Sequence, residues 1–236
     1  MVKSKGVLSM KVTNFLLILL ILLTSGCTSN VKSQQPEQLI DGTIDFLKGK
    51  ENIVFLLNST IILNDKIATV NLKGVQFNPE GQTYYLGNTA GYRLELYENQ
   101  DKIYIKNQEN QWVDIKEAGV PELKSFLSTP LTLLNYTKYG DFSFLENKVR
   151  VSRKRQIILS GTLKEEGVID FLKNLHLESL EDTNEYLVEM SLYINEKKGT
   201  LSKIDLFVTE LSGQFSLVTE IIITNYNVET DIIPPQ

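Results

Sequence analysis

The chain has 236 residues, with 24 basic and 29 acidic side chains and a formal net charge of −5. Residues 1–26 contain three lysines and no acidic residue, so the chain without them has 21 basic and 29 acidic side chains and a net charge of −8. Binding to nucleic acid depends on basic side chains that neutralise phosphates, so this acidic composition predicts no nucleic-acid partner.

The N-terminal segment has the pattern of an export signal. Three lysines precede a run of nine apolar residues, Phe15–Leu23. A helix needs about 20 apolar residues to cross the core of a bilayer, so this run is too short to span one. The small residues Thr24, Ser25 and Gly26 follow it. A basic leader, an apolar run and small residues in this order are typical of a cleaved secretory signal peptide.

The segment Leu22–Cys27, LLTSGC, resembles the lipobox of bacterial lipoprotein signal peptides, with Thr24 in the place where leucine is commonest. In that family a diacylglyceryl group is attached to the cysteine, and cleavage leaves the lipidated cysteine as the first residue. The resemblance implies a signal peptide over residues 1–26, lipidation of Cys27, and a polar tether over residues 27–35. Cys27 is the only cysteine, and the alternative is an ordinary signal peptide followed by an incidental thiol.

Lipidation of Cys27 would determine where the protein resides. Two buried acyl chains, such as palmitate, hold a protein at a bilayer far more firmly than one. The acidic charge of the domain gives no attraction to anionic headgroups, so the acyl chains themselves are the membrane contact. The expected location is the outer face of the cytoplasmic membrane of a bacterium, with a Gram-positive source favoured.

Residues 36–236 contain no Pro-, Gly- or Ser-rich linker, and their length suits a single domain. They begin with an amphipathic segment, Pro36–Lys48, in which Ile40, Ile44 and Leu47 share one helical stripe and Pro36 suits the first turn. From residue 52 to 115 the pattern changes to about six short strands separated by turns. Tyr92–Tyr97 alternates clearly, with Leu94 and Leu96 on one face, so antiparallel hairpins are predicted.

A second helical region follows at residues 120–136. Its apolar residues recur at intervals of three and four, and Pro130 should break or kink the helix at Thr129. Beyond it the pattern predicts strands at about 142–151 and 153–162, a helix at Lys164–Leu175, and three long strands that include residues 186–194, 204–208 and 215–226.

This order of elements resembles the lipoprotein-carrier superfamily, which includes the LolA/LolB and LppX/LprG groups. The resemblance rests on element order and on texture such as YRLELYENQDKIYIKNQENQWVDI at residues 92–115. It implies an α+β fold in which a curved antiparallel sheet of about 11 strands forms an incomplete barrel, with helices covering its concave face. A sheet that is apolar on one face must bury that face, and the amphipathic segments are the available cover.

A helix interrupted at Thr129–Pro130 packs less completely than a straight one, so a cavity is expected beside it. A cavity lined by Leu and Phe side chains suits acyl chains. By position, the expected ligand-binding residues are Leu94, Leu96, Leu123, Phe126, Leu127, Leu131 and Leu134.

Groups that carry catalysis are scarce. His176 is the only histidine, and Cys27 is assigned to lipid, so no Ser–His–Asp or Cys–His arrangement can be assembled. The segment Gly87–Gly91, GNTAG, lacks the lysine and the following helix of a nucleotide-binding loop. The protein is expected not to be an enzyme and to hold no metal or cofactor. Two functions fit: a membrane-anchored lipoprotein that binds or carries a lipid-like apolar ligand, or an extracytoplasmic sensor that docks an envelope protein.

Overall fold

The computed structural model describes residues 35–78, 80–89, 92–100, 102–145, 150–151, 154–175, 186–229, 232 and 235. Residues 35–236 form one compact unit. The expected signal peptide, Cys27 and nearly all of the expected tether lie outside the described residues, as does His176.

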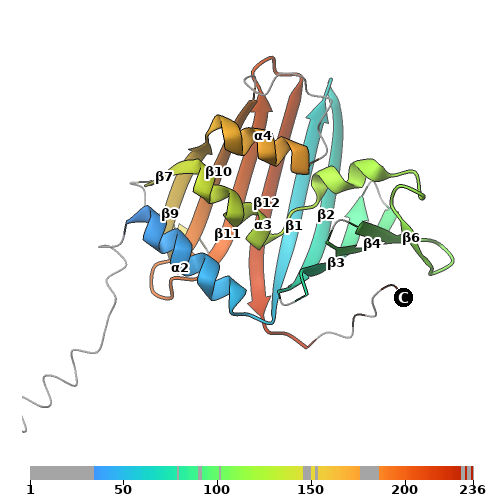
Figure 1. Ribbon diagram of the computed structural model, residues 1–236, viewed down its shortest axis with the longest axis horizontal. Coiled ribbons are helices and arrows are strands. Elements are labelled where there is room, and N and C mark those ends of the chain that lie inside the picture. Colours follow the sequence, from blue (N-terminus) through green and yellow to red (C-terminus); the bar gives the residue numbers. More distant parts are fainter. Residues whose placement is uncertain are drawn as a thin grey trace, which may run out of the picture. The chain divides into compact units, whose positions relative to one another are not determined.

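One open antiparallel sheet dominates the fold (Figure 1). Its 11-strand order is β6-β5-β4-β3-β2-β1-β12-β11-β10-β9-β7, and β8 pairs with β9 outside this order. The predicted α+β fold with about 11 antiparallel strands is confirmed. The strands are β1 (Asn52–Leu63), β2 (Lys66–Phe77), β3 (Gln82–Thr89), β4 (Tyr92–Asn99), β5 (Lys102–Lys106), β6 (Trp112–Asp114), β7 (Gly140–Phe144), β8 (Arg150–Val151), β9 (Lys154–Leu163), β10 (Tyr186–Asn195), β11 (Leu201–Glu210) and β12 (Phe215–Tyr226).

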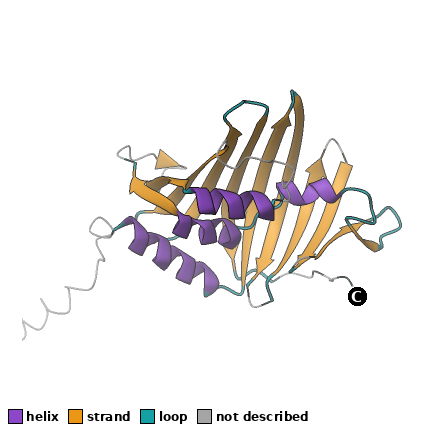
Figure 2. Cartoon of the chain, turned by 45° about the horizontal axis from the view of Figure 1, so that its top comes forward, coloured by secondary structure: helices purple, strands orange, loops and turns teal. Residues whose placement is uncertain are grey.

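The helical segments lie on one face of this sheet (Figure 2). They are α2 (Pro36–Lys48), the 3-10 helix η2 (Pro121–Phe126), α3 (Pro130–Asn135), the 3-10 helix η3 (Tyr136–Tyr139) and α4 (Glu165–Asn174). Strand residues on the covered face are mainly Leu, Ile, Val and Phe, and many of them are completely buried. Burial of this apolar face is therefore the main stabilising term of the fold.

Helix α2 has the predicted bounds, with Pro36 in its first turn and Leu39, Ile40 and Leu47 buried. Its C-terminal end is fixed by a neighbouring loop, because the Nδ2 of Asn78 donates hydrogen bonds to the carbonyls of Leu47 and Lys50 at 2.6 and 2.8 Å. These bonds satisfy carbonyls that the helix end leaves without partners.

The break predicted at Thr129–Pro130 is present, but the helices on either side are shorter than expected. Thr129 has extended backbone, as a residue before proline prefers, and its Oγ1 accepts a hydrogen bond from the N–H of Thr132 at 3.2 Å. The first part is a 3-10 helix instead of an α-helix, and α3 has only six residues. The strand predicted at about 142–151 is also interrupted, since β7 ends at Phe144.

Gly74 is required by the packing of the apolar face. The ring of Phe55 is fully buried and lies against the backbone of Gly74, where a Cβ would overlap the ring atoms. Tyr85 meets the Phe55 ring edge-on, with centroids 6.1 Å apart. The ring is enclosed by protein, so it can move away from a Cβ at position 74 only by shifting its neighbours.

We expect Gly74→Ala to lower the free energy of unfolding by about 1–3 kcal/mol, because extra atoms in a filled core force side chains and backbone to shift. Gly42→Ala is the matched control: a Cβ at Gly42, within α2, meets nothing within 4 Å. Alanine there should stabilise the helix by about 0.5–1 kcal/mol. Urea denaturation of both variants measures the difference, and equal stability for the two would contradict this packing.

Candidate functional site

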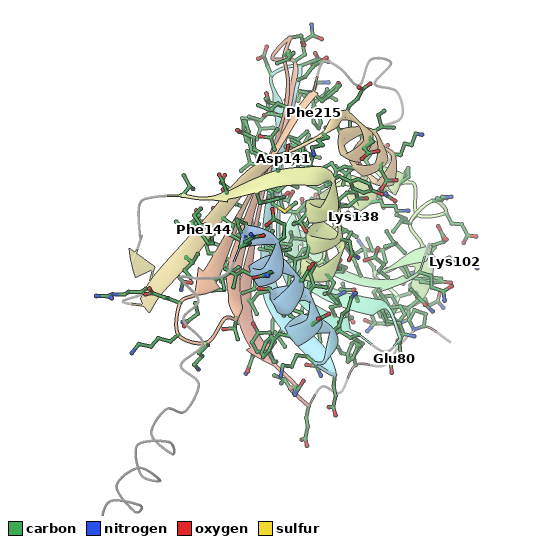
Figure 3. The ribbon with its side chains drawn as sticks, turned by 60° about the vertical axis from the view of Figure 1, so that its left-hand side comes forward. Glu80, Lys102, Lys138, Asp141, Phe144 and Phe215 are labelled. Carbon is green, nitrogen blue, oxygen red and sulfur yellow. The ribbon has the colours of Figure 1, made fainter. Side chains whose placement is uncertain are left out.

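A groove of about 440 Å³ separates α2 from the chain that follows α3. Figure 3 shows α2 beside η3 and β7, which the labels Lys138 and Asp141 mark. Apolar side chains from both sides line the groove, namely Ile40, Ile44, Leu134 and Phe142. Charged residues at its rim are Glu37, Asp41, Asp45, Lys48 and Lys138. Its volume falls within the range of about 300–1,000 Å³ that is typical of ligand pockets.

A smaller pocket lies on the other side of α3, against α4. Its volume is about 140 Å³, which is below the usual size of a ligand pocket. Apolar residues at its base are Leu127, Leu133, Phe171 and Leu175. Helix α3 therefore stands between two hollows, with Leu133 facing the pocket and Leu134 facing the groove.

Polar contacts join the cover around α3 to α4. The Oγ of Ser125 donates to the carbonyl of Leu175 at 2.7 Å, and the Nδ2 of Asn174 donates to the hydroxyl oxygen of Tyr136. The Tyr136 ring meets the ring of Phe171 edge-on at 5.1 Å. These contacts connect the covering segments to one another, whereas their contacts with the sheet are mainly apolar.

Glu98 is an inward-facing carboxylate at the edge of the smaller pocket. It follows Leu94 and Leu96 on the same face of β4, and it is half-buried. The hydroxyl of Tyr85 donates a hydrogen bond to its Oε2 at 3.1 Å. Burial raises the pKa of Glu98, although the Tyr85 hydrogen bond and the nearby charge of Lys124 oppose the rise. Burial also raises the pKa of Tyr85.

The structure divides the residues predicted to line a cavity. Leu134 lines the groove and Leu127 lines the smaller pocket. The linings of these two hollows do not include the other five, Leu94, Leu96, Leu123, Phe126 and Leu131. Leu94, Leu96 and Phe126 are buried, and Leu123 and Leu131 are half-buried.

Sequence reasoning did not assign Ile40, Ile44, Phe142 or Glu98 to a site. The sequence shows that Ile40 and Ile44 lie on the apolar side of a helix. It does not show which segment of the chain lies opposite that side. A signal for Glu98 existed in the alternation of YRLELYEN, because the carboxylate occupies a position on the same face as Leu94 and Leu96.

The chain was compared with protein families, curated proteins and solved structures, and only solved structures are similar to it. No protein-family model and no curated protein matches the chain. The crystal structure of the lipoprotein LppX from Mycobacterium tuberculosis is similar, with a TM-score of 0.52, 11% identity, and coverage of 84% of this chain and 100% of LppX. LprF from Mycobacterium bovis gives a TM-score of 0.51 and 12% identity, with coverage of 85% and 98%.

A putative outer membrane lipoprotein-sorting protein domain from Vibrio parahaemolyticus is more distant, with a TM-score of 0.33, 9% identity, and coverage of 83% of this chain and 93% of that one. The chain thus has the fold of LppX and LprF, as its element order predicted.

Within the described residues, no helix is long and apolar enough to cross a membrane. The same residues contain no group of three or more His, Cys, Asp or Glu side chains placed to hold a metal ion.

The raised pKa of Glu98 predicts a pH dependence of stability. The folded pKa lies above the ordinary value of 4.5, so the unfolded chain loses this proton first and stability falls as pH rises from about 4.5 through the folded pKa. In Glu98→Gln, which keeps an acceptor for Tyr85, this contribution is absent. Unfolding free energies of both proteins between pH 4.5 and 7 should therefore diverge in favour of the variant, and parallel curves would mean that the folded pKa of Glu98 is not raised.

Proposed function

We propose that the protein is a membrane-anchored extracytoplasmic lipoprotein that binds a lipid-like apolar ligand in the groove between α2 and α3. The observation that carries the proposal is the groove itself, which has the volume of a ligand pocket and a floor of Ile40, Ile44, Leu134 and Phe142. An apolar lining with charged groups at the rim suits a ligand with an acyl chain. We assign no catalytic role to the site.

The anchor in this proposal is diacylglyceryl-modified Cys27, and two observations support it. The lipobox-like LLTSGC precedes the domain, and the structure covers the full length of LppX, which is described as a lipoprotein. Residues 27–35 reach at most about 30 Å when extended, so the domain would remain close to the bilayer. The proposed location is the outer face of the cytoplasmic membrane of a Gram-positive bacterium.

Helix α3 is the element that a ligand would displace. It has six residues, and it begins at a break in the helical chain. A ligand that widened the groove would have to replace the packing of Leu134, which is completely buried. The apolar part of the ligand provides that replacement, so the exchange keeps apolar surface away from water.

A second function has one observation in its favour. Leu94, Leu96 and Leu134 are almost inaccessible to solvent, which describes a filled interior. A filled interior fits an interaction lipoprotein that docks an envelope protein on its surface and carries no ligand. Ligand-binding measurements decide between the two functions.

Ile44→Asn should weaken binding of the apolar fluorescent probe N-phenyl-1-naphthylamine by about tenfold, a change of about 1.4 kcal/mol. Ile44 is half-buried in the groove, so the domain should remain folded. Ile67→Asn is the control, because Ile67 is 69% exposed in β2 and lies outside the groove. Fluorescence titration and denaturant midpoints are measured together. If wild-type protein binds no probe, the interaction function is favoured instead.

Cys27→Ser should abolish lipidation and leave residues 1–26 attached, because both steps require the cysteine in the lipoprotein family. Intact-mass measurement of protein extracted from membranes should show the acyl groups on the wild-type chain and their absence from the variant. An unmodified Cys27 in the wild-type protein would refute the anchor, and it would leave the ligand groove to be judged by the probe titration.

A further inference from the structure

The face of the sheet opposite the helices carries a hollow of about 620 Å³. It crosses six neighbouring strands, β9, β10, β11, β12, β1 and β2. Its lining combines amides, hydroxyls and carboxylates with two exposed apolar side chains. The residues that line it are Asn58, Thr60, Thr69, Asn71, Ser160, Glu189, Ser191, Asp205, Leu206, Phe207, Val218 and Glu220.

The strand register explains why this face is hollow. One row of directly paired residues crosses five strands and consists of Asn58, Glu220, Asp205, Ser191 and Ser160. Several of these side chains are short, so they form a low floor. Neighbouring strands are about 4.8 Å apart, and polar groups therefore recur at a spacing similar to the rise of one sugar in an extended polysaccharide.

Hydrogen bonds hold the central part of this row in place. The Nζ of Lys203 lies 2.8 Å from an Oε1 of Glu220 and 3.0 Å from an Oδ2 of Asp205. The Nδ2 of Asn58 donates to the other oxygen of Glu220 at 3.1 Å, and the hydroxyls of Ser160 and Ser191 are 3.1 Å apart. Groups ordered in this way lose little conformational entropy when a ligand binds.

Phe207 and Val218 supply the apolar part of the hollow. They are paired across β11 and β12, and they are 39% and 45% exposed. An exposed aromatic ring beside planar amide and carboxylate groups offers one surface for the C–H face of a sugar and hydrogen-bonding groups for its hydroxyls.

We propose that this hollow binds a neutral oligosaccharide chain that lies across the strands. The lining includes no basic residue, and the adjacent Lys203 is paired with two carboxylates, so an anionic ligand is disfavoured. The polar floor does not suit an acyl chain. The site is thus separate from the apolar groove on the other face of the sheet, and it does not depend on the function proposed for that groove.

The test is a calorimetric titration of the full-length chain in detergent micelles with tetra-N-acetylchitotetraose and with cellotetraose, both of which are neutral. At least one of them should bind, and Phe207→Ala should weaken that binding by about tenfold or more. Leu211→Ala is the matched control, because Leu211 is a 72% exposed side chain outside the hollow; its affinity should equal that of the wild type. Asn71→Ala should also weaken binding, because Asn71 lines the hollow from β2. Asn71 is exposed, so this variant should fold even if Phe207→Ala does not.

Three results would overturn the inference. The first is the absence of binding by both oligosaccharides at millimolar concentration. The second is an equal loss of affinity in Phe207→Ala and Leu211→Ala, which would mean that the hollow is not the binding surface. The third is that tetralysine binds, the oligosaccharides do not, and Glu189→Gln abolishes the binding of tetralysine. The hollow would then be a site for a cationic peptide.

Discussion

The fold depends on covering one apolar face of a wide sheet with little helix. Eleven strands in register present rows of Leu, Ile, Val and Phe on one side, and such a face must be removed from water. The described residues offer three α-helices and two 3-10 turns for this purpose, and α3 has only six residues. Because the helical layer consists of several short segments, it has several boundaries between segments. The groove and the smaller pocket lie at two of these boundaries.

The same register that buries the apolar rows also defines the outer surface. Side chains alternate between the two faces of a strand, so a shift of one residue in any pairing would exchange the inner and outer sets. The inner Ser59 and Thr219 are paired with each other by a hydrogen bond of 2.9 Å, and the next residues along these strands, Thr60 and Val218, face the outside. Inner core and outer hollow are thus two results of one set of backbone pairings.

Local pattern was sufficient to predict most elements of the fold. The apolar stripe of Pro36–Lys48 predicted α2 with its observed bounds, and alternation in Tyr92–Tyr97 identified β4 and its inward-facing leucines. Long-range packing was not predictable in this way. Nothing in the stripe of α2 indicates that Ile44 lies across a groove from Leu134, and periodicity cannot distinguish an apolar residue that lines a hollow from one that fills a core. Leu94 and Leu96 alternate like pocket residues in the sequence, but they are buried and line neither the groove nor the smaller pocket.

The sheet is open, and this gives it a mechanical freedom. Within the described residues, β6 and β7 stand at opposite ends of the strand order and are not bonded to each other. A sheet whose margins are joined has a perimeter fixed by its ladder of hydrogen bonds. Here the curvature can change through small adjustments of twist between neighbouring strands, while every interstrand hydrogen bond is kept. Closer curling of the sheet would deepen its concave side, and flattening would make that side shallower.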